Sequence, residues 1–134
     1  MIYFGKHMAK NINYEVVKEK VNNYIKEMDA QYEACKQELD NYYNAFNDGE
    51  NYEWFNEVNT LKFIRTWEII RNEITIPQRN LLIAYEIAGN RLEPCLQYFN
   101  GEGEGIKNKS SLAVLISNAR KAVKCKYFEK YGID

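Results

Sequence analysis

The residues with the most distinctive chemistry in this sequence are cations that gather near its end. Residues 105–131 hold seven lysines and arginines and one acid, a balance of +6, although the whole chain has a net charge of −1. Ammonium and guanidinium groups bind phosphate oxygens, so this segment is suited to a polyanion such as DNA. Residues 13–60 have the opposite balance, −7, from four lysines and eleven acids. This split predicts that one half contacts a polyanion and the other half has a different role.

The cations follow a helical pattern over residues 110–130. One side of this helix would carry the apolar residues Leu112, Leu115, Ile116, Ala119, Ala122, Val123 and Tyr127, and the other Ala113, Val114, Ser117, Arg120, Lys121 and Lys124. As a recognition helix it would offer its first residues to base edges and its later cations to phosphates. The predicted DNA-binding residues are Lys107, Lys109, Ser110, Val114, Ser117, Arg120, Lys121 and Lys124. The alternative is an ordinary amphipathic helix with a solvated charged face.

Residues that could carry catalysis or hold a metal do not form a recognisable site. Glu50, Glu53 and Glu57 have helical spacing but lack a His, Cys or Ser partner. The Gly/Glu segment at 101–105 is not a phosphate cradle, because its two acids would repel phosphate and no strand precedes it. His7 is the single histidine, and no local pair of metal ligands exists. We therefore predict no enzyme activity, no metal and no cofactor.

The cysteines and the hydropathy pattern bear on the compartment. Cys35, Cys95 and Cys125 are odd in number and widely spaced, so each is predicted to be a small buried hydrophobe in a reducing environment. No apolar run approaches the ~18 residues that a membrane span needs. The first residues also lack the apolar core of a signal peptide. These features predict a cytoplasmic protein that does not contact a membrane.

The rest of the chain is organised as helices that would support the basic segment. With 134 residues, 46% of them hydrophobic and 28% charged, the chain can form one globular core. Residues 1–12 have no periodicity and are predicted to be a tail. Residues 13–46 form one long helical pattern, roughly 50 Å if continuous. Its apolar stripe consists of Tyr14, Val17, Val21, Tyr24, Met28, Tyr32, Cys35, Leu39, Tyr42 and Phe46.

That first helix needs a partner for its stripe. A second helix is predicted over 52–74, with Trp54, Val58, Leu61, Ile64, Trp67, Ile70 and Ile74 facing inward and Phe55 and Phe63 beside them. The two helices would form an antiparallel hairpin over 13–74. We favour a role for the first helix in the core of a bundle, and the alternative is homo-oligomerisation or binding of a protein partner through residues 13–46.

Helix signals continue after residue 74. Thr75 and Gln78 fit a capping box for a third helix ending at Ala88, and Gly89 suits the position after its C-cap. Asn90 and Glu93 fit a second capping box, which would open a fourth helix with Leu92, Leu96 and Phe99 inward. A loop over 100–109 leads to the basic helix. The predicted fold is all-α, with the helical hairpin followed by a trihelical, helix-turn-helix-like bundle over 75–134.

Residues 75–123 resemble the helix-turn-helix in the C-terminal DNA-binding region of bacterial sigma factors. The layout is also similar to that of phage late-gene transcriptional regulators that carry this domain behind a helical segment. The matching residues are Pro77, Gln78, Arg79, Asn80, Leu81, Leu82, Tyr85, Gly89, Leu96, Leu115, Ile116, Ala119, Arg120, Lys121, Ala122 and Val123. The resemblance implies that the last helix enters the major groove of DNA. The loop over 100–109 is longer than the family's turn of about 3–4 residues, so the alternatives are a member with an insertion or generic trihelical packing.

Two functions remain open from the sequence. The first is a DNA-binding transcriptional regulator of phage or mobile-element type, acting in the cytoplasm of the host cell. The second is a small helical structural or interaction protein of a phage particle or another large assembly. The long apolar stripe and a surface rich in Tyr and Asn suit large polar interfaces.

Overall fold

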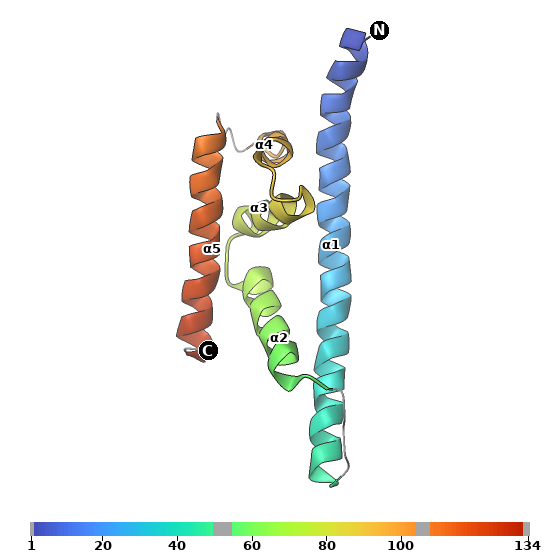
Figure 1. The fold of residues 1–134 in the computed structure, drawn as a ribbon, viewed down its shortest axis with the longest axis vertical. Helices are drawn as coiled ribbons and strands as arrows, with labels where there is room; N and C mark the ends of the chain where they lie inside the picture. The colour runs from blue at the N-terminus through green and yellow to red at the C-terminus, as the bar shows by residue number, and fades with distance from the viewer. Residues whose placement is uncertain (1, 50–54, 104–107, 133–134) are drawn as a thin grey trace.

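Five helices arranged in three layers make up the part of the chain that the structure describes. The computed structural model describes residues 2–49, 55–103 and 108–132. The helices are α1 (Ile2–Asn47), α2 (Glu57–Asn72), α3 (Ile76–Ile87), α4 (Leu92–Gly101) and α5 (Lys109–Tyr131). Figure 1 shows α1 along one side, α5 along the other, and α2, α3 and α4 between them. No described residue forms a strand, and the predicted all-α class is confirmed.

Helix α1 begins earlier than the sequence predicted. Its first residue is Ile2, so the backbone of 2–12 is helical and the prediction of a tail is wrong there. The apolar periodicity that located the helix starts only at Tyr14, so the preceding turns carry no such signal. Adding a residue to an existing helix costs far less than starting one, and no proline interrupts this segment. A helix can therefore extend beyond the residues whose periodicity predicts it.

The apolar stripe of α1 is directed at the rest of the molecule, as predicted. Val17 and Val21 are buried, and the other members from Tyr14 to Tyr42 are half-buried. The exception is Phe46, which is 70% exposed while its neighbour Ala45 is buried. Helix α1 packs against α2, α3 and α4 in turn. It is therefore more than one arm of a hairpin, because it supports both of the predicted segments.

A single buried cluster joins the two segments that the sequence separated at residue 74. It draws on all five helices, through Val17, Val21, Trp67, Leu81, Ile83, Ala84, Cys95, Tyr98, Phe99, Leu112 and Ile116. Several of its members were not assigned inward from the sequence, including the buried Ile83, Ala84 and Tyr98. The shared core means that α5 is held by packing against α2 as well as against α3 and α4.

The ends of α3 are set by local hydrogen bonds. The predicted capping box is present: the Gln78 amide donates to Thr75 Oγ1 (3.2 Å), and the Thr75 amide donates to Gln78 Oε1 (3.1 Å). The helix ends in a Schellman motif, in which the Asn90 amide donates to the Tyr85 carbonyl and the Gly89 amide to the Glu86 carbonyl. Gly89, at φ +67°, occupies the left-handed position that favours glycine.

Asn90 does not cap α4 as predicted. Its φ of 62° is left-handed, whereas an N-cap residue is extended, and its amide is already bonded within the motif that ends α3. The residue before α4 is Arg91, which makes no side-chain cap bond and instead donates from Nε to the Ala88 carbonyl at 3.0 Å. The Asn90–Glu93 capping box was therefore a wrong prediction, because the C-terminal signal of α3 uses the same residue.

Helix α2 is shorter than predicted. It begins at Glu57, and the Asn56 side chain accepts a hydrogen bond from the Asn59 amide at 3.0 Å. Val58, predicted to face inward, is 75% exposed, while Ile69, not predicted, is fully buried. The cap at Asn56 places Val58 in the exposed first turn of α2. Trp54 lies outside the described residues.

Tyrosine hydroxyl groups on α1 donate to glutamates spread over the other helices. The donor–acceptor pairs are Tyr43–Glu57 (2.8 Å), Tyr32–Glu68 (3.0 Å), Tyr24–Glu86 (2.9 Å) and Tyr14–Glu102 (2.7 Å). The acceptors lie on α2, on α3 and just after α4. Hydrogen bonds to a charged acceptor are stronger than neutral ones, so these pairs fix α1 along its length.

These bonds predict a loss of stability at alkaline pH. The pKa of Tyr14 is raised to about 12, chiefly by its hydrogen bond to Glu102, and those of Tyr24 and Tyr32 to about 12, chiefly by burial. A raised folded-state pKa means that this stability is complete below about pH 10 and is lost as the pH rises through about 12. Urea unfolding at rising pH measures it. The variant Tyr24→Phe should lose part of the pH dependence, and an unchanged profile would contradict this account.

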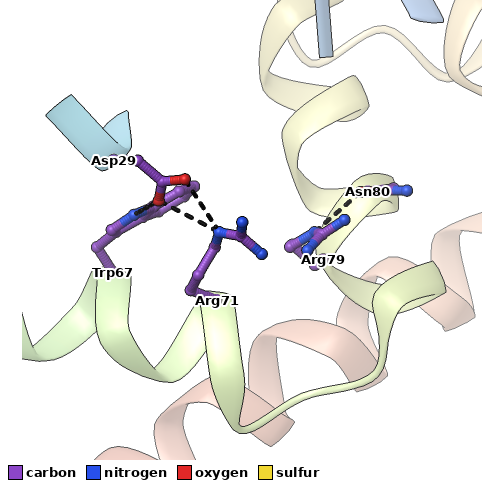
Figure 2. Close-up of polar contacts among 5 residues, drawn as sticks. All are labelled: Asp29, Trp67, Arg71, Arg79 and Asn80. Atoms are coloured by element: carbon purple, nitrogen blue, oxygen red, sulfur yellow. Dashed lines mark hydrogen bonds and ion pairs between the residues drawn. The ribbon is translucent and has the colours of Figure 1, made fainter. Parts of the chain in front are cut away.

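Asp29 joins α1 to α2 through two donors (Figure 2). The indole Nε1 of the buried Trp67 donates to Asp29 Oδ1 at 2.8 Å, and Arg71 Nε lies 3.2 Å from the same oxygen. Arg79 on α3 lies nearby and donates to Asn80 Oδ1 at 3.0 Å. Burial, and then the charge of Arg71, lower the pKa of the Arg79 guanidinium below its ordinary value. Asp29 is thus the acceptor that satisfies the indole at the α1–α2 contact.

Gly101 allows α1 to approach the end of α4. A Cβ atom at this position would overlap the ring of Tyr14, which also stacks on Tyr98 with ring centroids 6.0 Å apart. The substitution Gly101→Ala is expected to lower the free energy of unfolding by about 1–3 kcal/mol, because the ring must move and its bond to Glu102 is lost. Denaturant unfolding measures this effect.

A double-mutant cycle separates this overlap from helix propensity. In a Tyr14→Ala background, Gly101→Ala should be neutral or slightly stabilising, since alanine favours helix and no ring remains to be displaced. Equal destabilisation with and without the Tyr14 ring would contradict the proposed contact.

Candidate nucleic-acid interface

The two faces of α5 separate as the sequence predicted. The helix begins after Asn108, whose side chain accepts a hydrogen bond from the Ser111 amide at 2.8 Å. Leu112, Ile116 and Ala119 are buried, and the remaining residues of the predicted inner face are half-buried. All six residues of the predicted outer face are exposed: Ala113, Val114, Ser117, Arg120, Lys121 and Lys124. The packing of α5 against α2, α3 and α4 leaves this outer face open.

The predicted contacts at the start of α5 lie in different surroundings. Lys107 lies outside the described residues. Lys109 forms an ion pair with Glu93 of α4, with Nζ 3.3 Å from Oε2. Ser110 and Ser117 are exposed, and Val114 is 58% exposed. The first half of the outer face is therefore uncharged beyond Lys109, and it offers hydroxyl and methyl groups to solvent.

The second half of the outer face carries the cations. The Arg120 guanidinium lies over the ring of Tyr85 on α3, 5.4 Å from the ring centroid, which is a cation–π contact. Lys121 follows Arg120 directly and Lys124 lies on the next turn, and no acid among the described residues forms an ion pair with either lysine. Two ammonium groups and one guanidinium thus project from adjacent turns of a helix whose backbone is held by the core.

These cations line a groove between α3 and α5. The groove has a volume of about 730 Å³ and brings together four of the predicted residues, Ser117, Arg120, Lys121 and Lys124. Its other wall includes Tyr85, Glu86 and Asn90. Sequence reasoning missed these three, because their position depends on how α3 crosses α5. Glu86 accepts the Tyr24 hydroxyl group at one oxygen and is the one acid among the lining residues of the groove.

Other lysines of the basic segment lie in ion pairs. Lys126 lies 3.6 Å from Glu129, one turn along α5. Lys130 contacts two acids of the α2 region, Glu68 at 3.6 Å and Glu73 at 3.9 Å. The cations of α5 therefore fall into two groups, one lining the α3–α5 groove and one paired within the chain.

The cysteines, and the acids that the sequence places at helical spacing, have ordinary surroundings. Cys95 is fully buried as predicted, and burial raises the pKa of its thiol to about 12. Cys125 is exposed on α5, so the prediction that it is buried was wrong. The helical pattern of the sequence had placed Cys125 on neither the apolar nor the charged face of α5. Of the three acids at helical spacing, Glu57 accepts the Tyr43 hydroxyl group, while Glu50 and Glu53 lie outside the described residues.

Three broader findings complete the description of this site. None of the helices in the described part of the chain is both long and apolar enough to cross a membrane. The three helices α3, α4 and α5 contact one another. Comparison of the chain with known protein families, with curated proteins and with solved structures finds no match.

Proposed function

We propose that this protein is a DNA-binding transcriptional regulator of phage or mobile-element type that uses the outer face of α5. The observation that carries the proposal is the group of Arg120, Lys121 and Lys124 along one groove, without a paired acid among the described residues at either lysine. Phosphate contacts supply most of the affinity of such proteins and require cations held in fixed positions. The packed inner face of α5 provides that support.

The two halves of the outer face suit different parts of duplex DNA. From Ser110 to Lys124 the helix rises about 21 Å. Its first turns, with Ser110, Val114 and Ser117, are small enough to approach base edges in the major groove. Its later cations would then reach the phosphates that border the groove. In this arrangement Lys109 would exchange its ion pair with Glu93 for a phosphate contact.

The layer opposite α5 carries exposed charges of both signs. The outward side of α1 has the acids Glu15, Glu19, Glu27 and Glu33 and, between or beside them, the lysines Lys18, Lys20, Lys26 and Lys36, and α1 lies on the far side of α2–α4 from α5 (Figure 1). That side is therefore only weakly acidic, and the attraction for a polyanion comes from the cations of α5. The overall charge of −1 is therefore no obstacle to binding through α5.

Fluorescence anisotropy with mixed-sequence duplex DNA, titrated from low to physiological salt, tests this function. We expect micromolar or tighter binding at low salt that weakens steeply as salt rises, because each phosphate contact releases counterions. Absence of binding at low salt would refute the proposal. Steep salt dependence would justify a search for a specific DNA sequence, which the protein would bind in the cytoplasm of a host cell.

The second candidate is a small helical structural or interaction protein of a phage particle or another large assembly. It is favoured by the far end of α1, where Phe46 is 70% exposed and Tyr43 is 40% exposed. A protein partner or a second copy would contact α1 there, within the 13–46 segment. Light scattering with a Phe46→Ser variant tests it: a loss of assembly would support this role, and a strict monomer in both forms would count against it.

A further inference from the structure

A smaller pocket lies where α1, α2 and α3 meet, and its chemistry differs from that of the basic groove. It has a volume of about 240 Å³. Three of its lining residues are aromatic, namely Tyr24 of α1 and Phe63 and Trp67 of α2. Pockets for drug-sized molecules measure about 300–1,000 Å³, so this one suits a smaller ligand.

Aromatic rings and a thioether give this pocket electron-rich walls. The Tyr24 and Trp67 rings are inclined at 61° with their centroids 6.3 Å apart, so they form two adjoining walls instead of one flat stack. Met28 lines the same pocket, and its sulfur atom is soft and polarisable. The face of an aromatic ring is negative and attracts a cation within about 6 Å of its centroid. Walls of this kind favour a cation over an anion.

A carboxylate borders the pocket at its solvent side. Glu86 of α3 is the one charged residue among the described residues that line it, and this residue is exposed. Its Oε2 atom accepts the Tyr24 hydroxyl group at 2.9 Å, and no cation in the described part of the chain forms an ion pair with it. Because Trp67 is buried, the pocket combines an apolar floor with an acidic mouth.

We propose that this pocket binds a small quaternary ammonium molecule of the choline type, with its methyl groups against the aromatic rings and its charge beside Glu86. Aromatic side chains recognise such cations through cation–π attraction. A metal ion or a plain ammonium would lose a tight water shell on entering, whereas the methyl groups of a quaternary ammonium gain by leaving water. The other lining residues are apolar apart from Thr66, which suits those methyl groups.

Isothermal titration calorimetry of the full chain with choline tests this proposal, with the total ionic strength held constant by sodium chloride. The assay contains no DNA, because Glu86 also lines the basic groove and the proposed ligand does not depend on DNA binding. We expect saturable binding of choline, at least about fivefold tighter than that of 3,3-dimethylbutan-1-ol, which has the same shape without the charge. Absence of saturable choline binding, or equal affinity for the neutral alcohol, overturns the proposal.

Two variants test the residues that would select the cation. Glu86→Gln keeps an oxygen acceptor for the Tyr24 hydroxyl group but removes the charge, so it should weaken choline binding about tenfold and leave binding of the neutral alcohol unchanged. Phe63→Leu keeps an apolar side chain but removes a ring, and should weaken choline binding about fivefold. Circular dichroism checks that both variants remain helical.

Glu57→Gln is the matched control for the carboxylate. Glu57 accepts the hydroxyl group of Tyr43 of α1 as Glu86 accepts that of Tyr24, but it does not line the pocket. This control should bind choline as tightly as the normal chain. If Glu86→Gln kept full affinity for choline, or if Glu57→Gln lost as much affinity as Glu86→Gln, the assignment of the pocket would be overturned.

Discussion

Replacing Lys121 and Lys124 together with alanine is expected to weaken binding to duplex DNA roughly 50-fold at about 0.1 M salt. Both side chains line the α3–α5 groove, and no acid among the described residues pairs with them. Each phosphate contact contributes close to one power of the salt concentration to the affinity. The slope of log affinity against log salt should therefore fall by about 2.

The matched control removes the same charge from the same helix. Lys126 and Lys130 are paired with Glu129, Glu68 and Glu73, so alanine at both should change affinity much less. Equal losses in the two double variants would show that only net charge matters, and the assignment of the groove would fail.

Arg120 is left in place in this experiment for a structural reason. Its guanidinium lies over the Tyr85 ring, so an alanine there would remove a contact between α3 and α5 as well as a charge. Thermal unfolding of the Lys121/Lys124 variant should match that of the normal chain, because both side chains are exposed. A loss of binding together with a loss of stability would not support a direct DNA contact.

Asp29→Ala should lower the free energy of unfolding by about 2–3 kcal/mol, the larger of the effects expected on stability. The variant leaves the Nε1–H group of the buried Trp67 without its acceptor. An unsatisfied buried donor costs about 1–3 kcal/mol. The half-exposed pair with Arg71 adds less than about 1 kcal/mol, because solvent screens it.

Two further variants identify which bond of Asp29 is responsible. Asp29→Asn keeps an oxygen acceptor for the indole and should retain most of the stability, while Arg71→Ala removes only the exposed partner. Denaturant unfolding of the three variants should rank Asp29→Ala as the most damaging. If Arg71→Ala were as damaging as Asp29→Ala, the ion pair rather than the indole bond would hold α1 on α2.

Much of the local structure could be predicted from the sequence, because helix periodicity and helix caps depend on residues that are close together in the chain. The stripe of α1 and the two faces of α5 were predicted almost residue by residue, since apolar side chains recur every three or four positions. The Thr75–Gln78 capping box and Gly89 were also read correctly, because each depends on bonds within one turn. Where two local signals met, at Asn90, the C-terminal signal of α3 prevailed.

The tertiary structure decided which helix covers each apolar face and which distant residues meet there. Periodicity shows that one side of α1 is apolar, but not that α2, α3 and α4 share it. Tyr14 and Glu102 are 88 positions apart, and only the crossing of α1 over α4 makes them partners. The same holds for Tyr85 beneath Arg120 and for the exposure of Cys125 and Phe128. Local sequence sets the faces of the helices, while their contacts arise from burying those faces together in one core.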